Sequence, residues 1–154
     1  MLREQLLEKK SVLVVEDNDT MSGVLVMMVR SLGAKLVDAA TTFDHALSSC
    51  ELNRYDVILM DVHLDHGKDG IALAKAVKER GWDHEALLIF VTGSISRSVV
   101  DSALQVNPDG YVAKPLSCAS LANSIWKAML QRQRRKLEEA GVVTEIDAEP
   151  SAPG

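Results

Sequence analysis

Short runs of apolar residues alternate along this chain with longer segments in which apolar residues recur every three or four positions. The runs at residues 12–15, 57–60 and 87–91 are apolar throughout, as in strands that are covered on both faces. The longer segments have the spacing of helices with one buried face. In chain order, the expected strands are 12–15, 35–39, 56–60, 86–91 and 110–113, and the expected helices are 19–32, 42–52, 70–80, 96–106 and from 117 onward.

The order of these elements predicts the fold class. Five strand–helix pairs with connections of a few residues favour an α/β fold, a doubly wound five-stranded parallel sheet with helices on both faces. The expected strand order is 2-1-3-4-5, and an eightfold barrel would need a much longer chain. The winding then reverses between the first and third strands, so a crevice is expected at their carboxyl ends.

Residues able to bind a metal or a phosphoryl group stand at the ends of four strands. Glu16 and Asp17 follow the first strand, Asp61 follows the third, Thr92 follows the fourth and Lys114 follows the fifth. Each taken singly is more often a capping or loop residue, but their joint occurrence argues against that interpretation. Because the carboxyl ends of parallel strands lie side by side, residues more than ninety positions apart are expected in one pocket.

This set of side chains favours phosphoryl chemistry assisted by a metal. Clustered carboxylates repel each other, and they bind a cation or share a proton to relieve the repulsion. Hard oxygen ligands without histidine or thiolate at metal-binding spacing suit Mg²⁺. The Lys114 ammonium and the Thr92 hydroxyl can each contact a phosphoryl oxygen. Asp61 ends the middle strand among those that contribute and is therefore the expected nucleophile.

Length, composition and charge narrow the protein class. The chain has 154 residues, of which 47% are hydrophobic and 25% charged, which is typical of one soluble domain. A net charge of −5 gives no general affinity for nucleic acid or an anionic membrane. No apolar run approaches the ~20 residues of a membrane span, so a cytoplasmic location without a membrane partner is expected. Cys50 and Cys118 are expected to be free thiols.

The two ends of the chain differ in composition from the middle. Residues 1–10 predict a short helical extension, residues 11–130 one domain, and residues 131–154 the end of the last helix followed by a disordered acidic tail. Four cations in this last part, Arg132, Arg134, Arg135 and Lys136, precede acidic residues. We interpret them as a solvated helix end rather than a nucleic-acid site, so direct DNA binding is not expected.

Four motifs resemble the bacterial response-regulator receiver family over residues 11–130. They read V-V-E-D-N at 14–18, I-L-M-D-V at 58–62, F-V-T-G at 90–93 and Y-V-A-K-P at 111–115. The resemblance implies a flavodoxin-like receiver fold in which Asp61 accepts a phosphoryl group from a phosphohistidine on a sensor histidine kinase or a histidine phosphotransfer protein. It also implies that Asp17, Asp61 and the backbone carbonyl of His63 bind Mg²⁺, with Glu16 assisting through water. The chain would promote its own phosphorylation and dephosphorylation without being a metabolic enzyme.

The resemblance further implies a switch. Phosphorylated Asp61 would draw Thr92 inward, and the ring of Tyr111 would follow into the vacated space. This movement would change a protein-binding surface on the fourth helix, fifth strand and fifth helix, which is also the expected surface for a homodimer and for a downstream protein target. The chain departs from the family at Asp65, where a proline is frequent. The charged loop at residues 65–69 is therefore expected to be more mobile.

Three functions remain open at this stage. The favoured one is a stand-alone, single-domain response regulator without an output domain of its own. A receiver-like module that binds partners without phosphorylation is the second, although the complete set of Asp17, Asp61, Thr92 and Lys114 argues against it. A Mg²⁺-dependent phosphohydrolase with an aspartate nucleophile is the third. It lacks the expected second acid, because His63 stands two residues after Asp61.

Overall fold

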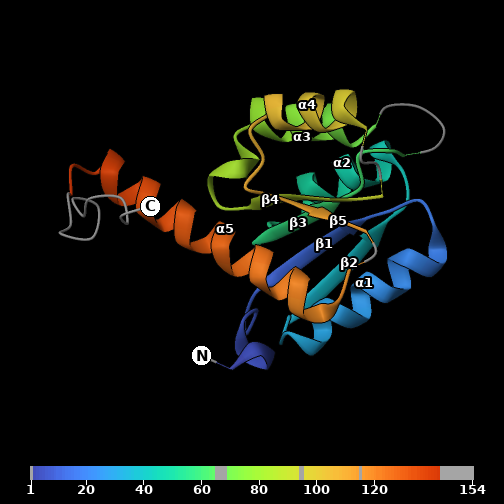
Figure 1. Ribbon diagram of the computed structural model, residues 1–154, viewed down its shortest axis with the longest axis horizontal. Coiled ribbons are helices and arrows are strands. Elements are labelled where there is room, and N and C mark those ends of the chain that lie inside the picture. The colour runs from blue at the N-terminus through green and yellow to red at the C-terminus, as the bar shows by residue number, and fades with distance from the viewer. Residues whose placement is uncertain (1, 65–68, 94–95, 115, 143–154) are drawn as a thin grey trace.

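A five-stranded parallel sheet forms the centre of the molecule (Figure 1). The computed structural model describes residues 2–64, 69–93, 96–114 and 116–142. The strand order β2-β1-β3-β4-β5 confirms the predicted doubly wound fold class. The strands, in chain order, are β1 (Ser11–Val15), β2 (Leu36–Ala40), β3 (Val57–Met60), β4 (Leu87–Thr92) and β5 (Gly110–Ala113).

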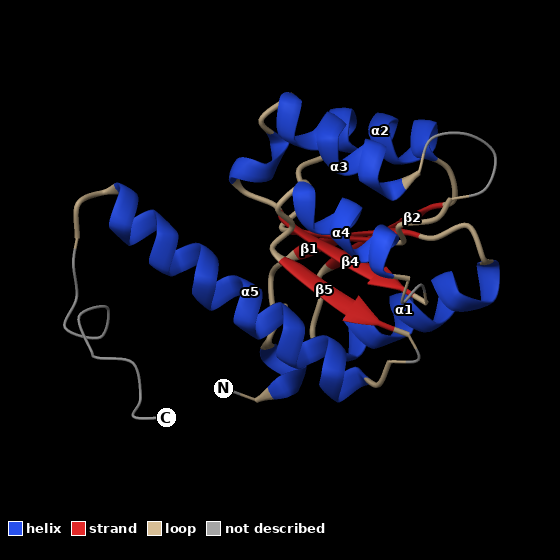
Figure 2. Cartoon of the chain, turned by 45° about the horizontal axis from the view of Figure 1, so that its top comes forward, coloured by secondary structure: helices blue, strands red, loops and turns tan. Residues whose placement is uncertain are grey.

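Helices cover both faces of this sheet (Figure 2). They are α1 (Asp19–Ser31), α2 (Phe43–Leu52), α3 (Gly70–Glu79), α4 (Arg97–Gln105) and α5 (Cys118–Glu139), with 3₁₀ turns η1 (Arg3–Gln5) and η2 (Trp82–His84). The side chains of Thr42 and Ser96 accept hydrogen bonds from the backbone N–H groups of His45 and Val99. Both residues are therefore N-caps, and α2 and α4 begin one residue later than expected.

Two apolar layers hold the helices to the sheet. Leu13, Ile58 and Phe90 are buried in the layer beneath α2, α3 and α4. Val14 and Ile89 are buried in the opposite layer beneath α1 and α5. Successive side chains of a strand point to opposite faces. Continuous apolar runs in β1, β3 and β4 are thus explained by burial on both sides.

The segment before β1 contributes two leucines to the second layer. Leu6 and Leu7 are buried, and the Leu7 N–H donates to the carbonyl oxygen of Leu32 at 2.8 Å. Where a short helix was expected, the segment forms the single turn η1 and then reverses at Lys9, whose φ is 63°.

The last helix continues well past the sheet and is fastened to it by arginines. Arg132 donates from Nη2 to Oδ2 of Asp109 at 2.7 Å, and Arg135 donates from Nη2 to Oδ1 at 3.0 Å. Arg132 also donates from Nη1 to the carbonyl oxygen of Asp83 at 2.6 Å. Arg132 thus belongs to a largely buried ion pair with Asp109, while the side chain of Arg135 is 43% exposed, so only part of the basic run is a solvated helix end.

Some expectations fall on positions that lie outside the described residues. These are the charged loop at 65–68 and the acidic tail at 143–154. Among the described residues, no helix is both long enough and apolar enough to cross a membrane.

Candidate functional site

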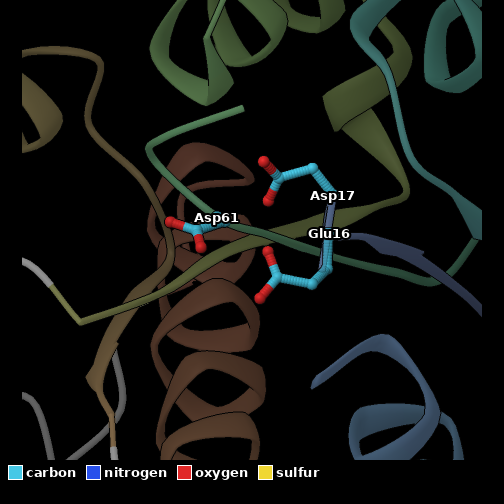
Figure 3. A group of neighbouring side chains, drawn as sticks. All are labelled: Glu16, Asp17 and Asp61. Carbon is cyan, nitrogen blue, oxygen red and sulfur yellow. The ribbon is translucent and has the colours of Figure 1, made fainter. Parts of the chain in front are cut away.

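Three carboxylates from two neighbouring strands meet at the carboxyl edge of the sheet (Figure 3). Glu16 and Asp17 follow β1, and Asp61 follows β3. The parallel pairing of Val15 with Met60, and the 3.0 Å hydrogen bond from the Asp61 N–H to the Val15 carbonyl oxygen, align these two strand ends. One carboxylate oxygen from each acid lies within 4.8 Å of the other two. The structure therefore brings together the acidic residues that the sequence places 44 positions apart.

Lys114 joins two of these acids from the far side of the pocket. Its Nζ donates to Oδ2 of Asp61 at 2.9 Å and to Oε1 of Glu16 at 2.5 Å. The Lys114 N–H donates to the carbonyl oxygen of Thr92 at 2.8 Å, which continues the pairing of β5 with β4 and directs the lysine toward the pocket. A single ammonium thus partly offsets the charge of the cluster.

Glu16 is the most buried acid of the three. It is 1% exposed, and its Oε2 has no hydrogen-bond partner among the described residues. The pKa of Glu16 is raised to about 7: burial is the largest cause, the hydrogen bond from Lys114 acts in the opposite direction, and the neighbouring Asp61 adds to the increase. Burial tends to lower the pKa of Lys114, but its hydrogen bonds to Glu16 and Asp61 outweigh this and raise it.

The two predicted switch residues lie on adjacent strands beside this pocket. Thr92 is fully buried at the end of β4. Tyr111, on β5, is half-buried, and its ring lies against Phe90 with 6.4 Å between ring centroids. Burial raises the pKa of the Tyr111 hydroxyl, and the negative charge of Asp61 contributes to the same change.

His63 contacts Asp61 through its backbone. Its N–H donates to Oδ1 of Asp61 at 3.0 Å, and its side chain is exposed to solvent. Asp61 therefore has one oxygen bonded to the lysine and the other to a backbone N–H. Both bonds orient the carboxylate within the pocket.

Gly70 supports the site but was not identified from the sequence. A Cβ at this position would lie 1.9 Å from the carbonyl oxygen of Asp61, so only glycine fits. The preceding Asp69 caps α3 by accepting from the Ala72 N–H at 2.9 Å. The Asp-Gly pair at the start of a helix was the available signal, but only the tertiary structure shows that α3 begins against the backbone of Asp61.

The acidic cluster has the chemistry of a site for a hard cation. Glu16, Asp17 and Asp61 supply only oxygen ligands, which suit Mg²⁺ better than a softer metal. The unpartnered Oε2 of Glu16 can accept from a metal-bound water. A cation would also reduce the repulsion that Lys114 alone leaves partly uncompensated.

Known proteins are similar to this chain in sequence. The chain is 27% identical over 135 residues to the transcriptional regulatory protein PdtaR of Mycobacterium tuberculosis, a match that covers 88% of this chain and 64% of that protein. Two other curated relatives are matched over only 17% and 16% of their length. The chain thus spans less than two thirds of the curated relatives it matches.

Two solved structures with similar folds contain a metal ion, and one of them also has a phosphorylated aspartate. The receiver domain of sensor histidine kinase PA1611 from Pseudomonas aeruginosa, with magnesium coordinated in its active-site cleft, is 29% identical. It has a TM-score of 0.69 and covers 77% of this chain and 95% of that one. A response regulator from Burkholderia pseudomallei, with a phosphorylated aspartic acid and a calcium ion, is 25% identical. It has a TM-score of 0.69, and the match covers 84% of this chain and 74% of that one.

The match to a protein family covers most of the chain. Residues 12–126 match the response regulator receiver domain. This range includes β2 to β5, all of β1 except Ser11, and every residue of the acidic pocket. The chain therefore belongs to the response regulator receiver domain family of two-component signalling.

Proposed function

We propose that this protein is a single-domain response regulator whose Asp61 accepts a phosphoryl group from a phosphohistidine. The observation that carries the proposal is the position of Asp61 between a lysine ammonium and two further carboxylates at one sheet edge. Its side chain is 12% exposed, so one side of the carboxylate is open to a phosphodonor. The donor would be a sensor histidine kinase or a histidine phosphotransfer protein.

Each neighbouring residue has a separate role in this proposal. Asp17, Asp61 and the backbone carbonyl of His63 would hold Mg²⁺, and Glu16 would accept from a water on the metal. When bound, Mg²⁺ would neutralise negative charge on the phosphoryl group. Lys114 would exchange its contact with Oδ2 of Asp61 for a phosphoryl oxygen, and the Thr92 hydroxyl would donate to another.

The phosphoryl transfer forms an O–P bond to Asp61 as the N–P bond of the phosphohistidine breaks. The histidine nitrogen keeps the electron pair of that bond. Modification adds about −1.5 to −2 charges beside Lys114 and Thr92. In this proposal Thr92 moves toward the new group and Tyr111 follows, and α4, β5 and α5 then present a changed surface to a downstream protein or a second copy.

Incubation with Mg²⁺ and acetyl phosphate tests the proposal. Intact mass of wild type should increase by one phosphoryl group, and the increase should disappear in Asp61→Asn. Asp101→Asn is a matched control, because Asp101 is an exposed aspartate on α4. An adduct that persists in Asp61→Asn would contradict the assignment. No adduct in wild type would favour a phosphorylation-independent binding module, and rapid turnover of small phosphate esters would favour a hydrolase.

A further inference from the structure

The C-terminal half of α5 projects from the body of the molecule (Figure 1). Three large apolar side chains of α5 are exposed, one in its N-terminal half and two in its C-terminal half: Trp126 by 42%, Leu130 by 46% and Leu137 by 36%. Their separations of four and seven residues place them within about 40° of one another around the helix axis. We call these three residues the α5 stripe. A helix segment that projects into water with an apolar stripe is marginally stable unless something covers it.

Cations border the α5 stripe on both sides. Lys127 follows Trp126 and Lys136 precedes Leu137, so each lies about 100° from the stripe, in opposite directions. Both residues are exposed. A second copy packed against the stripe would bring like charges together, whereas an acidic segment would be attracted.

A turn at the end of α5 bonds Val142 to the last residue of the stripe. Gly141 has a φ of 79°, its N–H donates to the Glu138 carbonyl oxygen at 3.0 Å, and the Val142 N–H donates to the Leu137 carbonyl oxygen at 2.8 Å. This is a Schellman motif, in which the residue after the glycine commonly contacts the side chain five positions earlier. Val142 is 45% exposed, and it is tied by its backbone to the last residue of the stripe.

The residues after Val142 are mainly acidic and apolar, which complements the cations and the apolar side chains of the α5 stripe. No Lys or Arg occurs after Lys136. Acidic residues at Glu145, Asp147 and Glu149 alternate with Ile146 and Ala148. Trp126 lies eleven residues before Leu137, or about 16 Å along the helix, a distance that roughly five extended residues span.

We propose that residues 143–149 bind along the α5 stripe of the same chain. Their apolar side chains would cover Trp126 and Leu130, and their carboxylates would pair with Lys127 and Lys136. The proposal does not depend on phosphorylation of Asp61.

Trp126 fluorescence tests the proposal directly. In a Trp82→Phe background Trp126 is the only tryptophan of the chain. A chain ending at Val142 should emit at longer wavelength and be quenched more strongly by acrylamide than the full chain. A chain ending at Pro150 is the matched control and should behave like the full chain. The triple variant Glu145→Gln, Asp147→Asn, Glu149→Gln should shift emission in the same direction as truncation.

Two results would overturn the proposal. The first is identical emission and quenching with and without residues 143–154. The second is a shift that depends on protein concentration and accompanies a dimer in sedimentation, because a second copy would then cover the stripe. Should Trp82→Phe unfold the chain, the same comparison with both tryptophans present remains valid, since Trp82 contributes equally to the full and shortened chains.

Discussion

Two buried carboxylates, one at each edge of the sheet, are paired with cations in different ways. At the amino edge both oxygens of Asp109 are bonded: Oδ2 accepts from the Leu88 N–H at 2.8 Å and from Arg132, and Oδ1 accepts from Arg132 and Arg135. At the carboxyl edge Glu16 accepts from Lys114 through Oε1, while Oε2 has no partner among the described residues.

The difference separates a structural ion pair from a functional one. A buried carboxylate with every lone pair engaged keeps its arginines and neighbouring elements in place. A buried carboxylate with an unpartnered oxygen costs stability, and such groups are usually retained for a ligand or a reaction. The ion pairs of Asp109 at the amino edge therefore hold α5 in place. Glu16 at the carboxyl edge has an oxygen that can still accept a hydrogen bond from a ligand.

Removal of Asp109 should have the largest effect. Asp109→Ala leaves Arg132 without its buried counter-charge and the Leu88 N–H without an acceptor, so the free energy of unfolding should fall by about 3–5 kcal/mol. Urea denaturation measures the loss. The exposed Asp101→Ala control should change it by less than about 0.5 kcal/mol. If both substitutions lower the free energy of unfolding equally, the ion pairs of Asp109 do not stabilise the fold and the contrast with Glu16 fails.

Glu16→Gln should change how stability depends on pH. The pKa of Glu16 is raised from 4.5 to about 7, so between these values the folded chain binds more protons than the unfolded chain. The free energy of unfolding therefore falls as pH rises through this window. Without Mg²⁺, Glu16→Gln should reduce that decrease by about 2 kcal/mol, as measured by urea denaturation at pH 5 and pH 8.

The exposed Glu79→Gln on α3 is the control for this measurement. It should leave the pH dependence of wild type unchanged. If Glu16→Gln also leaves it unchanged, then charging Glu16 does not oppose folding, and the two buried carboxylates are energetically alike.

Mg²⁺ should stabilise the carboxyl edge alone. At ten times its dissociation constant a ligand that binds only the folded chain adds about 1.4 kcal/mol. Thermal denaturation with and without Mg²⁺ should show this gain in wild type and in Asp109→Ala, provided that the variant folds. Asp17→Asn should lose it, while the exposed neighbour Asp19→Asn should keep it. An equal gain in both neighbouring variants would contradict a role for Asp17.

The smallest effect is expected at a partly exposed ion pair. Lys78 and Asp83 lie 3.7 Å apart with side chains 29% and 25% exposed. Lys78→Ala should lower the free energy of unfolding by no more than about 1 kcal/mol, and raised salt should reduce the loss. A loss as large as that of Asp109→Ala would show that burial does not distinguish the two kinds of pair.

Periodicity predicted the elements to within one or two residues. Strand β2 lies one position later than the expected 35–39, and β4 one position later than 86–91. The apolar residues of a run do not show where a strand begins, because the hydrogen bonds that define its first residue are formed with the neighbouring strand. The 3₁₀ turn η1 departs from the expected helix for the same kind of reason, since the contact between Leu7 and Leu32 determines its path.

The arginine run shows the limit of local patterns more clearly. Arg132 and Arg135 resembled an ordinary solvated helix end until the fold placed Asp109 beside them, more than twenty positions earlier in the chain. Gly70 likewise appeared only as a helix start, although its lack of a side chain lets α3 begin against Asp61. Both contacts join segments that lie far apart in the sequence, whereas hydrophobic periodicity describes the residues of one segment only.

The sequence alone determined the parallel sheet, its order and the residues that gather at its carboxyl edge. These follow from apolar runs, short connections and the side-by-side placement of parallel strand ends. Only the tertiary structure decided how the gathered charges are balanced, because burial and individual atomic contacts depend on packing between distant segments. It leaves Glu16 with an unused oxygen and a raised pKa, and it pairs Asp109 completely.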